Sequence, residues 1–157
     1  MGAAWITNGS TSLAAVVNPL AAACDGGYVP EAIYFLDNPG IEERTERVES
    51  LMGTVVTAHG GAEPTITVTS LEHELAFGAI VDFIRSSVED AREAGHAVAI
   101  DVTPGRKFWS IISFRAGFEY EVDHVFYSHL KSNEFYGMVY PEIPRTAIEL
   151  IDFTEEL

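Results

Sequence analysis

The sequence predicts an α/β domain with a doubly wound, mostly parallel sheet and antiparallel strands at its C-terminal end. Short apolar runs typical of buried strands alternate with longer segments of helical character over residues 5–130. Most of these runs end in turns that contain Gly, Asn or Asp. Beyond residue 130 no helix-length segment separates the apolar runs, so the last strands are expected to form antiparallel hairpins. This order of elements predicts a Rossmann-like sheet.

The N-terminal part of the chain is predicted to begin with a strand at residues 5–7 and a turn at residues 8–12. Gly9 permits a tight turn, and the hydroxyl side chains after it suit the N-cap of a helix. That helix is expected at residues 13–24, and Pro19 within it should kink or divide it.

Two further strand–helix pairs follow in the chain. Strands are predicted at residues 32–36 and 65–69, and helices at residues 41–58 and 71–94. Asn38 comes shortly after the first of these strands. There it is either a ligand-binding residue at the carboxyl end of the sheet or a plain turn residue.

The central stretch is predicted as a buried strand at residues 97–100, a turn at 101–105 and a helix at 106–118. The helix is apolar nearly all round, so it is expected to be well buried. The remaining predicted strands lie at residues 122–130, 136–140 and 147–153.

Length and composition fit one domain with a full core, since 157 residues are enough for one. No apolar run approaches the ~20 residues of a membrane-spanning helix. The N-terminus has no charged segment followed by a long apolar one, so no secretory signal is expected. Cys24 is the single cysteine and lies in an Ala-rich run, typical of a small core residue. A cytoplasmic location is therefore expected.

The chain is strongly acidic, with 24 Asp and Glu against 9 Lys and Arg and a net charge of −15. Such a surface repels duplex nucleic acid and anionic membranes, so neither is expected as a partner. The composition resembles that of proteins from salt-loving archaea, in which high salt screens the repulsion. A haloarchaeal source is therefore expected.

Two of the few cations stand together at the start of the central helix, Arg106 and Lys107. The chain has only one other lysine, Lys131, so the position is unusual against the acidic background. A strand that runs through a Gly-containing turn into a helix exposes backbone N–H groups that favour an anion. The pair is either part of an anion site or the solvated start of a helix.

Other chemistries find little support in the residues. No Gly-x-Gly-x-x-Gly follows the first strand, and neither a phosphate-binding Gly-x-x-x-x-Gly-Lys-Ser/Thr nor a Gly-x-Ser-x-Gly is present. The five histidines are scattered, and no Cys/His pair has metal-ligand spacing. Neither a metal site nor a cofactor is expected.

The central stretch resembles the strand-four motif of the CRISPR-associated Rossmann-fold family, the CARF domains. That motif has an acidic residue, a hydrophobic residue, Thr, one or two Gly, Thr, Lys, two variable residues and Ser. The matching residues are Asp101, Thr103, Gly105, Lys107 and Ser110. Three positions depart from the common pattern: Pro104, Arg106 and Trp109. The turn at residues 9–12 resembles the family's other ligand-binding turn.

The resemblance implies a homodimer whose two halves form one pocket for a cyclic oligoadenylate, with cyclic tetra-adenylate as the expected ring. These rings are the second messengers of type III CRISPR immunity. The expected catalytic residues are Lys107, Arg106 and Ser10. The expected ligand-binding residues are Asn8, Gly9, Thr11, Ser12, Asn38, Asp101, Thr103, Gly105 and Ser110.

In this family the sensing domain is usually fused to an effector, for which 157 residues leave no room, so a lone sensing domain is expected. Three functions then remain open. The chain is a ring nuclease that cleaves the messenger without a metal, a non-catalytic sensor that acts on a separate partner, or an unrelated α/β protein that binds a phosphorylated metabolite.

Overall fold

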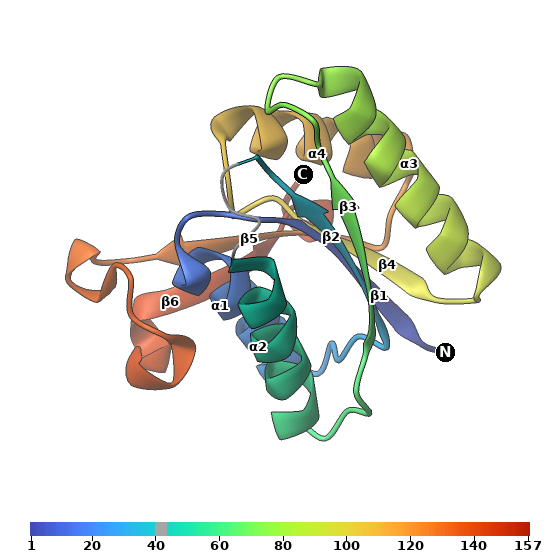
Figure 1. Ribbon diagram of the computed structural model, residues 1–157. Coiled ribbons are helices and arrows are strands. Elements are labelled where there is room, and N and C mark those ends of the chain that lie inside the picture. The colour runs from blue at the N-terminus through green and yellow to red at the C-terminus, as the bar shows by residue number, and fades with distance from the viewer. Residues whose placement is uncertain (40–43) are drawn as a thin grey trace.

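The computed structural model describes residues 1–39 and 44–157 (Figure 1). It contains one six-stranded sheet with helices on both faces. The regular elements, in chain order, are β1 (Ala3–Asn8), α1 (Leu13–Asp25), β2 (Ala32–Asp37), α2 (Thr45–Ala58), β3 (Thr65–Ser70), α3 (Phe77–Glu93), β4 (Ala97–Asp101), α4 (Lys107–Glu119), β5 (His124–Leu130), β6 (Ile148–Asp152) and α5 (Phe153–Glu156).

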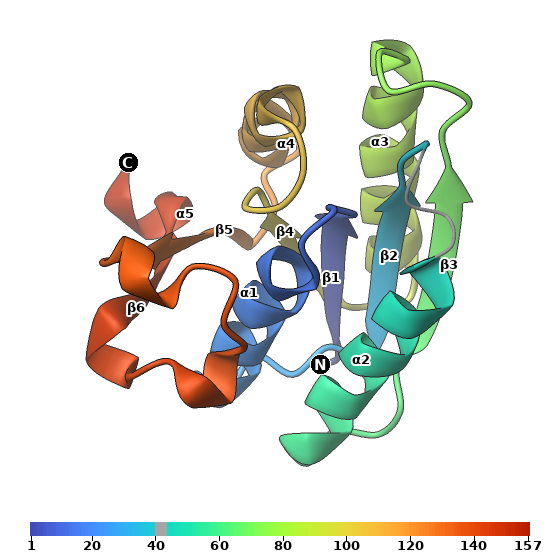
Figure 2. The same cartoon turned by 60° about the vertical axis from the view of Figure 1, so that its left-hand side comes forward.

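The strand order is β3-β2-β1-β4-β5-β6, and β5–β6 is the one antiparallel pair in the described sheet. Helices α1 and α2 cover one face, and α3 and α4 cover the other (Figures 1 and 2). The predicted fold class, a Rossmann-like doubly wound sheet, is confirmed. Because β1 and β4 are neighbours and are followed by helices on opposite faces, the strand order reverses between them.

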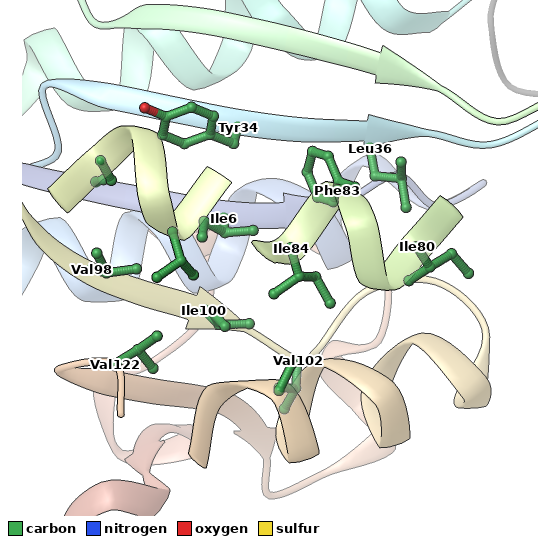
Figure 3. Packing of buried hydrophobic residues seen from close by; sticks show 14 of the residues in the cluster. Ile6, Tyr34, Leu36, Ile80, Phe83, Ile84, Val98, Ile100, Val102 and Val122 are labelled. Atoms are coloured by element: carbon green, nitrogen blue, oxygen red, sulfur yellow. The ribbon is translucent and has the colours of Figure 1, made fainter. Parts of the chain in front are cut away.

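Side chains of the central strands point alternately to the two faces of the sheet, and both faces are buried, so a core layer forms on each face. Ile6 of β1 pairs with Ile100 of β4, and both pack against Ile84 of α3 on one face (Figure 3). The preceding residue, Trp5, points to the other face and packs in the layer beneath α1 and α2. All four side chains are fully buried. The carboxyl ends of β1 and β4, from which the turns emerge, are therefore packed on both faces of the sheet.

Several helix boundaries differ from the sequence prediction. α1 runs unbroken through Pro19, which is buried, so packing outweighs the hydrogen bond that proline cannot make. α3 begins at Phe77 rather than at residue 71, because Leu71 continues the strand pairing by donating its N–H to Asp37 O at 3.0 Å. For the helix predicted at residues 41–58, residues 41–43 lie outside the described part of the chain, and α2 begins at Thr45.

The strand predicted at residues 136–140 is wrong. The segment between β5 and β6 instead forms three short 3₁₀ turns at Asn133–Phe135, Tyr140–Glu142 and Arg145–Ala147. Gly137 has a φ of +80°, and Pro141 lacks an N–H, so this sequence cannot supply a regular ladder. The chain returns in β6 and ends in the short helix α5.

Helix α4 is less buried than its composition suggested. Its Trp109 is fully buried, but Ile111 is 70% exposed and Phe118 is 39% exposed. Within residues 1–39 and 44–157, no helix is both long enough and apolar enough to cross a bilayer.

Candidate anion-binding site

Two strand-to-helix turns meet at the point where the strand order reverses. β1 ends at Asn8 and leads into α1, and the neighbouring β4 ends at Asp101 and leads into α4. Figure 2 shows both turns at the same edge of the sheet. In open α/β sheets this edge, at such a reversal, is where ligands bind.

Asp101 lies beneath the second turn and holds it in place. Its carboxylate is 0% exposed and accepts hydrogen bonds from Thr7 Oγ1 at 3.1 Å and from Thr103 N at 3.0 Å. Burial raises the pKa of Asp101 to about 7, and the hydrogen bonds from Thr103 and Thr7 oppose the shift. Asp101, expected from the sequence to contact a ligand, is thus fully buried beneath the turn, where its carboxylate fixes the turn backbone.

Two side chains of α4 tie the start of that helix to the end of β4. Trp109 Nε1 donates to Asp101 O at 3.1 Å, and Ser110 Oγ donates to Val102 O at 2.5 Å. Ser110, expected to bind ligand, therefore uses its hydroxyl proton within the turn. The bulky Trp109 is fully buried and packs inward.

The two turns touch each other at Gly105. Its φ is +85°, and a Cβ there would lie 2.3 Å from Asn8 Nδ2 and 3.0 Å from Gly9 O. Asn38 Nδ2 donates to Asn8 Oδ1 at 2.8 Å and to Gly9 O at 3.2 Å, which fixes the first turn from the β2 side. Asn8 is only 2% exposed. Asn8 and Asn38 therefore hold the first turn in its conformation through these hydrogen bonds.

A cavity of about 320 Å³ opens beside these turns. Five of the expected site residues line it: Ser10, Thr11, Ser12, Thr103 and Gly105. The rest of its wall comes from α1, β5, the segment between β5 and β6, and Ile148 of β6. This volume is at the low end for a small-molecule site.

The N-termini of the two helices differ in how their N–H groups are satisfied. Ser12 caps α1, because its Oγ accepts from Ala15 N at 3.3 Å. Arg106, the N-cap of α4, provides no side-chain acceptor. The N-cap side chain therefore does not occupy the first N–H groups of α4, and such a helix N-terminus favours an anion.

The two expected cations sit at that helix end, outside the lining of the cavity. Arg106 Nε lies 3.1 Å from Glu74 Oε2, and both side chains are largely exposed. Lys107 is exposed and forms no ion pair within the described residues. Of the two cations, Lys107 is therefore the one whose charge is not paired with a carboxylate of the described residues.

Sequence reasoning missed three residues at the site. Arg44 donates to Thr11 O at 2.6 Å and so brings a further cation to the first turn. Tyr136 lines the cavity and is 78% exposed, and Asn18 lines it from inside α1. Arg44 lies 33 positions from Thr11, and Tyr136 lies far from Asn18 in the sequence, so no local sequence pattern indicates that these residues meet. Among residues 1–39 and 44–157, no cluster of three His, Cys, Asp or Glu side chains is arranged to hold a metal ion.

No family model matches the sequence, and no curated protein matches it. Solved structures do match the fold. A type III CRISPR defence DNA nuclease activated by cyclic oligoadenylate gives a TM-score of 0.62 at 18% identity, over 83% of this chain and 19% of the nuclease chain. Enterococcus italicus Csm6, bound to cyclic hexa-2′-fluoro-hexa-dAMP, gives 0.61 at 12% identity, over 96% of this chain and 42% of Csm6.

Can2 from Sulfobacillus thermosulfidooxidans, in complex with cyclic tetra-adenylate, gives a TM-score of 0.57 at 14% identity, over 79% of this chain and 31% of Can2. The chain has a CARF-like fold. It spans less than half the length of each of these three proteins. At these identities the likeness is one of fold.

Proposed function

We propose that this protein binds a cyclic oligoadenylate, with cyclic tetra-adenylate as the expected ring, at the edge where β1 and β4 end. One observation carries the proposal: the uncapped N-terminus of α4, with Lys107 in its first turn, adjoins a hydroxyl-lined cavity at the strand reversal. The proposal is supported by two solved proteins with this fold: Can2 is in complex with cyclic tetra-adenylate, and Csm6 is bound to cyclic hexa-2′-fluoro-hexa-dAMP.

The chemistry of the site suits a phosphodiester. The N-terminal end of α4 and the Lys107 ammonium would stabilise the negative charge of a phosphate. Ser10 and Thr11 present hydroxyl groups from the opposite turn, where they can accept from or donate to a ribose. Since the chain carries a net charge of −15, this local cationic end is what attracts an anion.

The proposal includes a homodimer, because a ring of four nucleotides exceeds a cavity of about 320 Å³. Two copies related by a two-fold axis would each supply half of the pocket, and the ring itself has two-fold symmetry. One ring would then occupy two chains.

We place the contact between the copies on the α3–α4 apolar surface, formed by Phe77, Val81, Phe108, Ile111 and Ile112. Phe108 of this surface directly follows Lys107 in the chain, so the interface would adjoin the binding site. An isologous contact needs a self-complementary surface, and this one has an apolar centre with both charge signs beside it. Arg115 and Glu119, 3.9 Å apart, line the continuation of the same groove. Because the chain is so acidic, most other surfaces of two copies would bring negative charges together if they met.

Replacing Ile111 by Glu should therefore separate the copies. Ile111 is 70% exposed, so the change leaves the fold intact but places a charge in the apolar contact. Light scattering after gel filtration should give twice 17.1 kDa for the wild type and 17.1 kDa for Ile111→Glu. Val139→Glu, an exposed position away from this surface, is the control and should remain dimeric. A dimeric Ile111→Glu would show that the copies meet elsewhere.

Cleavage of the bound ring is the finer part of the proposal. The ribose 2′-oxygen bonds to the adjacent phosphorus as the bond to the 5′-oxygen of the next nucleotide breaks. The 2′-hydroxyl proton passes to solvent, and the leaving 5′-oxygen is protonated. Lys107 and Arg106 would stabilise the charge that develops on the phosphate, and Ser10 would orient the reacting ribose. No metal takes part in these steps.

A sensor without catalysis is the second candidate, and the cavity lining favours it. Among the residues that line the cavity there is no His, Asp, Glu or Lys, so no general base stands beside the ribose. Any cleavage should therefore be slow. If no cleavage occurs, a separate partner protein would have to recognise the ring-bound form of this protein.

Incubation of the purified protein with radiolabelled cyclic tetra-adenylate in high salt, with and without a chelator, separates these outcomes. Chelator-resistant conversion to linear products with a 2′,3′-cyclic phosphate supports the ring nuclease. A ring that is retained intact supports the sensor. If rings of four and six adenylates are both ignored, the function is that of another phosphometabolite binder and the likeness is one of fold alone.

A further inference from the structure

The segment between β5 and β6 presents an exposed aromatic ring to the cavity. Tyr136 is 78% exposed, whereas its neighbour Phe135 packs into the small core beneath the segment. Gly137 follows with a φ of +80°, which turns the chain at that point. Tyr136 lines the same cavity as Ser10 and Thr103. An aromatic side chain exposed to water beside this cavity is therefore available to a ligand.

The segment is fastened to the helix that starts at the first turn. Asn18 lies inside α1 and is 9% exposed. Its Nδ2 donates to Met138 O at 2.8 Å, and its Oδ1 accepts from Tyr140 N at 2.9 Å. Because one buried amide makes hydrogen bonds to two backbone groups of this segment, it fixes the position of the segment relative to α1.

A second anchor lies farther along the segment. Tyr140 OH donates to Asp25 Oδ2 at 2.8 Å, and the guanidinium of Arg145 stacks 3.8 Å above the Tyr140 ring. Arg145 Nε also pairs with Asp25 at 3.2 Å. With both anchors made, Tyr136 is held at a set distance from the hydroxyl-rich turn of α1, and a ligand need not order the segment when it binds.

We propose that Tyr136 forms a base-stacking subsite, in which its ring lies against an adenine of the bound oligoadenylate. The inference rests on the proposed function, since it assigns the base-recognising part of that same pocket. The turns and Lys107 supply groups for ribose and phosphate, and none of them recognises a base. Stacking of a base on an aromatic ring is sequence-tolerant but stronger for large bases, so the subsite favours purines.

Binding of cyclic tetra-adenylate to Tyr136 variants tests the subsite. Tyr136→Ala should weaken binding roughly tenfold to a hundredfold, the range expected for loss of one aromatic–base stack. Tyr136→Phe should bind like the wild type, because the ring and not the hydroxyl makes the contact. Val139→Ala, an exposed position on the same segment outside the cavity lining, is the matched control and should also bind like the wild type.

A direct readout comes from Tyr136→Trp. The two native tryptophans, Trp5 and Trp109, are fully buried, so the new indole is the one exposed to solvent. Its fluorescence should be quenched on addition of cyclic tetra-adenylate and much less on addition of inorganic phosphate. Unchanged affinity in Tyr136→Ala, or no quenching at saturating ring, would overturn the subsite while leaving the proposed function standing. A wild type that binds no adenylate ring would overturn both.

Discussion

Replacing Lys107 by Ala should abolish cleavage of a cyclic oligoadenylate, or weaken its binding at least tenfold, while the fold is retained. Lys107 is exposed at the first turn of α4, so its removal creates no cavity. The loss arises because the uncapped helix N-terminus keeps only its N–H groups to meet a phosphate, without the adjacent full charge. Isothermal titration with cyclic tetra-adenylate measures the binding, and circular dichroism verifies the fold.

Arg47→Ala is the matched control for this variant. It removes one positive charge from an exposed position on α2, a helix that contributes nothing to the cavity lining. Both variants change the net charge equally, so a general electrostatic effect would weaken them alike. A Lys107→Ala protein that binds and cleaves like the wild type would refute the role given to the central turn.

Asp101→Ala should destabilise the whole domain, by about 3 kcal/mol. The substitution removes the acceptor for Thr7 Oγ1 and Thr103 N and leaves a void in a fully buried position. Urea unfolding in high salt measures the change in the free energy of unfolding. A loss below 0.5 kcal/mol, about the size expected of a surface change, would contradict the supporting role of Asp101.

Asp101→Asn should reveal how the buried carboxyl responds to pH. Its folded pKa of about 7 lies above the ordinary 3.8, because burial disfavours the charged form. The stability that this group contributes is therefore fully present below pH ~4 and is lost as the pH rises through about 7. Asn cannot titrate but fills the same space and accepts from Thr103 N.

The measurement is the difference in unfolding free energy between the wild type and Asp101→Asn from pH 4 to pH 8. That difference removes the contribution of the other carboxyl groups, which both proteins share. It should move in favour of the Asn variant as the pH rises. A difference that is constant with pH would show that Asp101 has no raised pKa in the folded protein.

Much of the sheet was predictable because burial on both faces leaves its mark on the residues. The runs at residues 32–36 and 97–100 are continuously apolar, as central parallel strands require, and each lies within a strand of the structure. The two strand-to-helix turns were also visible, since Gly9 and Gly105 interrupt the pattern at the carboxyl ends of strands. The fold class followed from these elements alone.

The parts that escaped prediction depend on contacts between distant residues. The apolar residues at 136–140 suggested a strand, but their backbone partners are the side chain of Asn18 and local turns. Asp101 was expected at the ligand because it matches the motif, whereas in the structure it is fully buried and accepts from Thr7, 94 positions away. Arg44 gave no signal, because only the folded chain places it beside Thr11.

A calorimetric titration of the wild-type protein with cyclic tetra-adenylate in high salt tests ring binding directly, because it gives the stoichiometry along with the affinity. Saturable binding at one ring per two chains is expected, since each chain would hold half of the pocket. Absence of binding with rings of both four and six adenylates would contradict this expectation, and so would one ring per chain.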